Sequence, residues 1–391
     1  MLIIPETRLI FISFFIFGLL NNILYVVILS AAIDLVGSST PKAIVLLADI
    51  IPSLMIKVSA PFFIHKIAYQ VRVWGLVLLS TVGMLIISFS PQASISAKIL
   101  GICMASLASG MGEVSFLQLT HFYQEKYSIG GFLSGTGGAG LMGSFIYLIF
   151  TNVIGLKIWI SLLIFSLLPF GFVISFYLIL PTPTLTDELI SYQQLNDEQD
   201  SNHFWNTLNK IKPLIKPYMF PLCTVYISEY VINQGISPTL LYPLEDLPNW
   251  LFSSYRDIYV VYGFLYQLGV FISRSSINFG LRFRQLYWLT LLQFLNVLLT
   301  LHQSIYNTPF TSIWPLLCLI LYEGLLGGFS YVNTFMSVSE DVPKLKREFS
   351  MGCVGISDSF GVMMAGCINF WLESKLCSIQ VENGRDWCLN G

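Results

Sequence analysis

The side chains best suited to chemistry in this sequence are six ionisable residues inside long apolar stretches. They are Asp49, Lys57, Glu113, Glu229, Glu323 and Asp358. An ionised side chain in hydrocarbon costs about 2.5 to 3.5 kcal/mol on insertion scales, so these groups should face one another or a water-filled passage. Carboxylates and an amine in that setting can bind protons or the charged groups of a solute. We therefore predict that the six residues line a substrate and proton pathway.

A structural role is the alternative interpretation for each of these residues. A lone carboxylate can be buried between helices in a protonated or hydrogen-bonded form, and for Asp49 and Glu229 both interpretations stay open. Lys57, Glu113 and Glu323 are favoured as pathway residues, because the two glutamates recur at equivalent positions of an internal repeat. We expect Glu113 and Glu323 to face each other across a cavity, with Lys57 as a counter-ion or a contact for an anionic substrate group.

The glycine-rich stretch SGTGGAGLMGS, residues 134–144, contains the spacing of a dinucleotide-binding fingerprint. That fingerprint requires a buried strand before the glycines, whereas a short loop and an apolar helix surround them here. We therefore predict no nucleotide cofactor, and no spacing of His and Cys indicates a metal site. Instead, the glycines should allow close helix packing, expose backbone amides near Ser134 to an anionic substrate group, or act as a hinge. This prediction covers Gly135, Gly137, Gly138, Gly140, Gly352 and Gly355.

The composition identifies the elements that must hold these residues. The chain of 391 residues is 55% hydrophobic and only 11% charged, far from the composition of soluble domains. Apolar stretches long enough to cross a bilayer recur throughout, and we predict eleven transmembrane helices in an all-α membrane protein. Their approximate bounds are 9–30, 43–64, 73–89, 99–120, 132–154, 158–180, 218–240, 256–273, 285–301, 312–332 and 350–372.

The basic residues predict the orientation. Most of the 20 Lys and Arg residues fall on the side of the N-terminus, which should therefore be cytosolic. Eleven crossings then place the C-terminus in the lumen. We predict an N-terminal six-helix bundle, a cytosolic linker, a C-terminal five-helix bundle and a lumenal tail, at residues 1–180, 181–216, 217–372 and 373–391. Cys377 and Cys388 could form a disulfide in that tail.

The two halves of the chain resemble each other. Asn21 can be aligned with Asn233, Glu113 with Glu323, and the stretch GTGG at 135–138 with GCVG at 352–355. Each match is short. Together they indicate two parallel repeats in a 6+5 arrangement, as in major facilitator transporters, with the counterpart of the sixth helix missing.

Several motifs identify a resemblance that covers the chain from Asn21 to about Phe360. They are NNILYVVILSAA, GMGEVSFLQLTHFY, SGTGGAG, EYVINQG, GVFISRSS, ILYEGLLGGFSYVNTF and REFSMGCVGISDS. Together they resemble the battenin family, and the short chain resembles its fungal members. The resemblance implies a lysosomal or vacuolar membrane protein with a major facilitator-like fold of eleven helices. It also implies links to vacuolar pH and to transport of basic amino acids, notably arginine, or of glycerophosphodiesters.

The sequence thus predicts a vacuolar solute transporter that works by alternating access. Its expected partners are a small-molecule solute, protons and the lipid bilayer, with no nucleic acid. A non-transporting membrane scaffold that affects vacuolar pH indirectly is the alternative, although it does not explain two equivalent intramembrane glutamates. An enzyme is the least favoured class, since the sequence has no nucleophile and base, metal or nucleotide signature.

Overall fold

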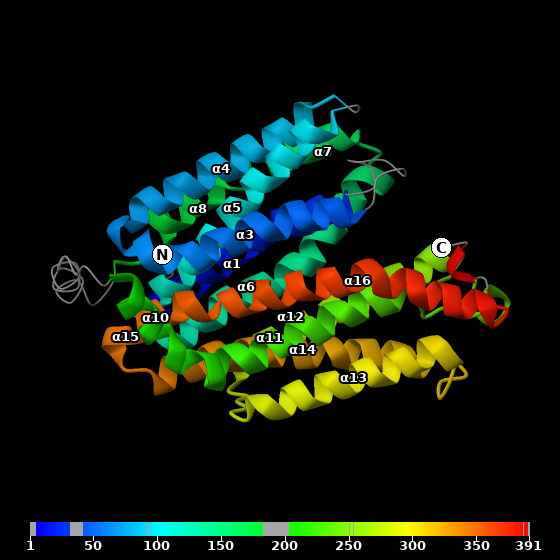
Figure 1. The fold of residues 1–391 in the computed structure, drawn as a ribbon. Helices are drawn as coiled ribbons and strands as arrows, with labels where there is room; N and C mark the ends of the chain where they lie inside the picture. Colours follow the sequence, from blue (N-terminus) through cyan, green and yellow to red (C-terminus); the bar gives the residue numbers. More distant parts are fainter. Residues whose placement is uncertain are drawn as a thin grey trace.

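The computed structural model describes residues 5–31, 42–91, 94–182, 203–249, 251–252, 254–385 and 387–389. All regular structure within these residues is helical, and they contain no strand. Figure 1 shows long helices that run alongside one another in two groups, one from each half of the chain. The predicted all-α fold class is confirmed, and it follows from the apolar composition because a helix satisfies its backbone hydrogen bonds internally.

The N-terminal bundle consists of the helices before residue 180. They are α1 (Glu6–Ser30), α3 (Lys42–Phe63), α4 (Tyr69–Phe89), α5 (Ile95–Leu119), α6 (Glu125–Leu148), α7 (Ile158–Phe165) and α8 (Phe170–Ile174). In this bundle α1 packs along α6, and α5 packs against both α3 and α4. The bundle is therefore organised around α5, the helix that carries Glu113.

The C-terminal bundle follows the same plan. Its helices are α10 (His203–Leu214), α11 (Phe220–Val231), α12 (Tyr255–Ser275), α13 (Leu286–Tyr306), α14 (Ile313–Asp341), α15 (Lys344–Val354) and α16 (Ile356–Glu382). Here α11 packs along α16, and α14 packs against α12 and α13. These pairs correspond to α1 with α6 and to α5 with α3 and α4, which agrees with the parallel repeat in the sequence.

The two bundles meet along two helix pairs. The helix α6 packs against α12, and α3 packs against α16. Figure 1 shows these four helices along the boundary between the bundles. In the repeat, α6 corresponds to α16 and α12 corresponds to α3. The contact between α6 and α12 is therefore the counterpart of the contact between α3 and α16. Side chains on α3 and α16 can therefore form contacts that neither bundle makes alone.

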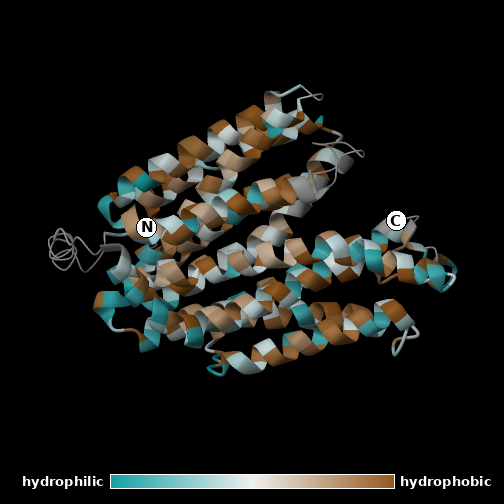
Figure 2. Ribbon diagram, viewed as in Figure 1, coloured by the Kyte–Doolittle hydropathy of each residue, from teal (hydrophilic) through white to brown (hydrophobic). Residues whose placement is uncertain are grey.

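Eight helical stretches in the described residues are long and apolar enough to cross a membrane. The other predicted spans fall on α11, which is only 12 residues long, and on α12 and α13, which carry polar side chains within the helix. For example, α12 contains Asp257 and Arg274, and α13 buries Gln293 and Asn296. Figure 2 shows hydrophobic residues along most helices and hydrophilic residues gathered at helix ends. The multi-pass membrane architecture is thus supported, with eight rather than eleven spans identified by apolarity.

The chain beyond the last predicted span is more ordered than a simple tail. The helix α16 continues to Glu382, past residue 372, and a disulfide joins Cys377 in this helix to Cys388. In the predicted linker, residues 183–202 lie outside the described residues. The remainder of that linker, from His203 onward, forms α10 and packs against α3 and α15.

Candidate functional site

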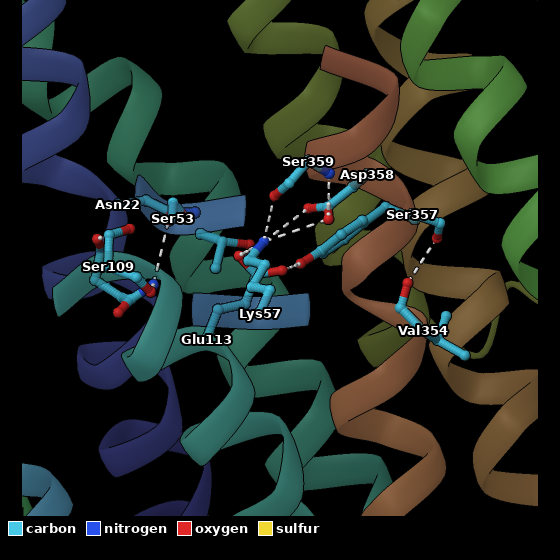
Figure 3. A network of polar contacts seen from close by, with 12 residues as sticks. Asn22, Ser53, Lys57, Ser109, Glu113, Val354, Ser357, Asp358 and Ser359 are labelled. Atoms are coloured by element: carbon cyan, nitrogen blue, oxygen red, sulfur yellow. Dashed lines mark hydrogen bonds and ion pairs between the residues drawn. The ribbon is translucent and has the colours of Figure 1, made fainter. Parts of the chain in front are cut away.

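A buried ion cluster lies at the boundary between the bundles. The Lys57 side chain on α3 is only 2% exposed, and its Nζ donates hydrogen bonds to Glu113 Oε2 at 2.7 Å and Asp358 Oδ1 at 3.3 Å. Lys57 also donates to Ser359 Oγ at 2.7 Å. Figure 3 shows the amine between Glu113 on one side and Asp358 and Ser359 on the other. The cluster thus joins α3 and α5 of one bundle to α16 of the other.

Tyr331 extends this cluster to a second cation. Its hydroxyl, on α14, donates to Glu113 Oε1 at 2.9 Å. The guanidinium of Arg274 lies 4.2 Å from the centre of the Tyr331 ring, a cation–π geometry. Arg274 also donates to Thr136 on α6 at 2.7 Å and to Tyr226 on α11 at 2.9 Å. We call Lys57, Glu113, Tyr331, Asp358 and Ser359 the Lys57 cluster, with Arg274 stacked on its edge.

The charges explain why this arrangement is stable. Lys57 alone faces two carboxylates, so the cluster without Arg274 has one negative charge in excess. Adding Arg274 balances the four charges. Compensation of this kind is required because an unpaired charge in a buried site is strongly destabilising. The sequence analysis did not select Arg274, because this residue directly follows the predicted span 256–273.

Glycines bring the helices of the cluster close together. A Cβ on Gly110 of α5 would lie 2.6 Å from the backbone oxygen of Ser53 on α3, so only glycine permits this approach. A Cβ on Gly355, where α15 meets α16, would lie 3.4 Å from Glu113 Oε1. That separation is an ordinary van der Waals contact, whereas a Cβ on Gly352 would lie only 2.9 Å from Gln118 Nε2 of α5. These small residues thus set how closely the helices around Lys57 approach one another.

The other predicted glycines lie on two faces of α6. A Cβ on Gly135 would overlap the backbone oxygen of Phe15, so this face packs directly on α1. Gly137, Gly138 and Gly140 face α12 of the other bundle, and a Cβ on Gly140 would overlap the side chain of Gln267. At these positions α6 is in close contact with α1 and α12. A hinge at these glycines stays a prediction.

A second group of buried carboxylates lies within the C-terminal bundle. Glu229 on α11 and Glu323 on α14 are each 1% exposed. The amide of Asn233 donates to Glu323 Oε1 at 2.9 Å and to the backbone oxygen of Glu229 at 2.9 Å. Tyr266 of α12 donates to Glu229 Oε1. In the described structure the Oε2 atoms of both glutamates have no hydrogen-bond partner, and no group of three His, Cys, Asp or Glu could hold a metal ion.

Asp49 lies apart from both groups. Its side chain is 4% exposed, and among the described residues its Oδ2 has no hydrogen-bond partner. It lines a cavity of about 10 Å³ together with Asn21 and Ser109, a space that suits about one water molecule. The structure therefore separates Asp49 from Lys57, although both residues belong to α3.

Glu113 and Glu323 do not face each other, and this expectation was wrong. The α14 residue that reaches Glu113 is Tyr331, eight positions after Glu323. At a rise of 1.5 Å per residue, Glu323 lies about 12 Å further along the helix. Its hydrogen-bond partner is Asn233 of its own bundle. Equivalent positions in the repeat therefore have different partners.

Two solved structures share the fold over almost the full chain. One is a Major Facilitator Superfamily transporter, FucP, in the outward conformation, with a TM-score of 0.62 and 12% identity. That match covers 99% of this chain and 94% of the other. A bacterial homologue of the iron transporter ferroportin in an outward-facing state has a TM-score of 0.60 and 17% identity, with 99% of each chain covered. The major facilitator-like fold is confirmed.

Sequence comparisons connect the chain to fungal proteins. It is 64% identical to Protein BTN1 of Debaryomyces hansenii over 100% of this chain and 99% of the relative. The identity is 62% to Protein BTN1 of Candida albicans, over the same shares of both chains, and 45% to that of Saccharomyces cerevisiae, over 96% and 97%. The family model described as CLN3 protein matches residues 12–204 and 186–379. The chain therefore belongs to the CLN3 protein family, the battenin family that its motifs resemble.

Proposed function

We propose that this chain is a transporter of the vacuolar, lysosome-like membrane that moves a small charged solute by alternating access. The observation that carries the proposal is the Lys57 cluster, in which a buried amine of one bundle holds a carboxylate of the other. Such a contact couples ligand binding to movement of the bundles. The fold, the apolar helices and the family support transport over catalysis.

The cluster suggests how a solute would drive the movement. An ammonium or guanidinium group of the solute can replace Lys57 at Asp358, and an anionic group can replace Asp358 at Lys57. Either exchange breaks this contact between the bundles. The first keeps each buried charge paired, because Lys57 retains Glu113, and the second does so when a cationic group of the same solute binds Asp358. Removing a partner without replacement would cost about 3 to 5 kcal/mol, so the empty protein retains the contact. The solute therefore lowers the barrier to rocking because it supplies the missing partner.

Both solute classes implied by the family suit this site. Glu113 and Asp358 can receive a basic amino acid such as arginine, whereas Lys57 and Arg274 can receive the phosphate of a glycerophosphodiester. The proposal places the bundles at residues 1–180 and 217–372, the N-terminus in the cytosol and the C-terminus in the lumen. The disulfide between Cys377 and Cys388 supports the lumenal side, because disulfides persist in oxidising compartments.

Flux into sealed liposomes tests the proposal. Purified protein should exchange labelled arginine or a glycerophosphodiester for the same unlabelled solute, and Lys57→Gln and Asp358→Asn should abolish this exchange. Lys157→Gln, which changes an exposed lysine, is the matched control and should leave exchange unchanged. If the wild-type protein exchanges neither solute, or if Lys57→Gln is fully active, the proposed role of the cluster is overturned. A wild-type protein without flux would favour the membrane scaffold.

A further inference from the structure

Glu229 and Glu323 form a buried pair of carboxylates that makes no ion pair within the described residues. Gly327, one turn after Glu323 on α14, shows where the Glu229 side chain lies relative to α14. A Cβ on Gly327 would lie 2.6 Å from Glu229 Oε2, so the Glu229 carboxylate rests directly on the α14 backbone beside Glu323. The two carboxyl groups therefore share one site between α11 and α14.

The ion pairs of the described residues do not include either glutamate. Arg274 lies close enough to Glu229 for electrostatic attraction, but its hydrogen bonds go to Thr136 and Tyr226. The remaining titratable groups that face the pair are tyrosines: Tyr226 and Tyr230 of α11 and Tyr266 of α12. The pair is thus surrounded by neutral hydroxyls, with one guanidinium that is already engaged in the Lys57 cluster.

Two carboxylates that share a buried site do not both ionise, because their repulsion adds to the cost of removing each charge from water. We propose that Glu229 and Glu323 hold a single exchangeable proton and form the proton-coupling site of the transporter. This inference rests on the proposed function and places coupling apart from the Lys57 cluster. The proton would lie on one of the two Oε2 atoms, which have no partner in the described structure.

The neighbouring groups favour a proton over a metal cation. Asn233 presents an N–H to Glu323, and Tyr266 presents an O–H to Glu229, so both neighbours point hydrogens at the pair. A metal cation would instead need several oxygen lone pairs, and hard cations such as Ca²⁺ take about six to eight oxygen ligands. The donated hydrogen bonds stabilise the one carboxylate that stays ionised, and the second carboxyl group carries the proton.

Transport driven by a pH gradient tests this assignment. With one coupled proton, a gradient of about one pH unit supports about tenfold accumulation of solute, since one unit corresponds to about 1.4 kcal/mol. In liposomes, Glu229→Gln and Glu323→Gln should reduce this accumulation to about onefold and should retain solute exchange without a gradient. Glu382→Gln, which changes an exposed glutamate, should behave like the wild type. Infrared spectra of purified protein should show a protonated carboxyl band that disappears in Glu229→Gln or Glu323→Gln.

The outcomes separate this inference from the proposed function. Wild-type protein that exchanges no solute would contradict transport itself. Wild-type exchange with normal accumulation in both Gln variants would overturn only the coupling site, and so would accumulation that follows a Na⁺ or K⁺ gradient instead of pH. If the variants fold too poorly for flux assays, the infrared band of the wild type decides: its absence overturns the shared proton.

Discussion

Replacement of Lys57 by Met is the sharpest perturbation of the bundle boundary. The amine lies 2.7 Å from a Glu113 oxygen and 3.3 Å from an Asp358 oxygen. At an effective dielectric constant of about 20, those attractions are about 6 and 5 kcal/mol, and much of this offsets desolvation. Met fills the same space and leaves two facing carboxylates, so the free energy of unfolding should fall by about 3 to 5 kcal/mol. Glu113→Gln should cost less, about 1.5 to 3 kcal/mol, because Lys57 keeps Asp358 and Ser359.

A double-mutant cycle measures the coupling between the two side chains. We expect the double variant Lys57→Met/Glu113→Gln to lose less than the sum of the single losses, by about 1 to 3 kcal/mol. The assay is unfolding by SDS in mixed micelles, followed by tryptophan fluorescence. Lys157→Met is the control for loss of an exposed lysine and should change stability by less than about 0.5 kcal/mol. Losses that add within about 0.5 kcal/mol, or a Lys57→Met loss below about 1 kcal/mol, would refute the argument.

Three further predictions concern packing, the second cation and topology. Gly135→Ala should destabilise the protein by about 1 to 3 kcal/mol in the same unfolding assay, because its methyl group overlaps the α1 backbone; Gly263→Ala, where no atom lies within 4 Å of the added carbon, should not. Arg274→Lys should slow solute exchange at least about tenfold, since a point charge replaces a planar group that stacks and donates to two hydroxyls; unchanged exchange would contradict this role. After reduction, Cys377 and Cys388 should react with a membrane-impermeant maleimide only from the lumenal side, and labelling of sealed vacuoles from the cytosolic side would reverse the orientation.

The sequence was most informative about single costly residues. Lys57, Glu113 and Asp358 could each be recognised because a charge in an apolar stretch is rare without a purpose. Their association could not be derived, since Lys57 and Asp358 are 301 positions apart and meet only when α3 packs against α16. Helix periodicity fixes which face a residue occupies, but it does not fix how far two bundles slide along each other.

The repeat predicted architecture better than chemistry. It correctly paired α1 with α11 and α5 with α14 in their packing roles, but it placed Glu113 opposite Glu323. The partner of Glu113 from α14 is Tyr331 instead, an uncharged residue that charge counting does not select. Arg274 was not selected for a related reason: it follows the predicted span 256–273, and only the assembled bundles show that its guanidinium donates to Thr136 and Tyr226.

The position of Lys57 beside Glu113 also bears on how the protein is made. Both residues belong to the first half of the chain, so the amine has an oppositely charged neighbour before the ribosome has synthesised Asp358. Lys57 and Glu113 can therefore enter the bilayer as a matched pair. Asp358 then adds to an ion pair that has already formed. The chain therefore does not need to keep Lys57 unpaired in lipid until α16 is synthesised.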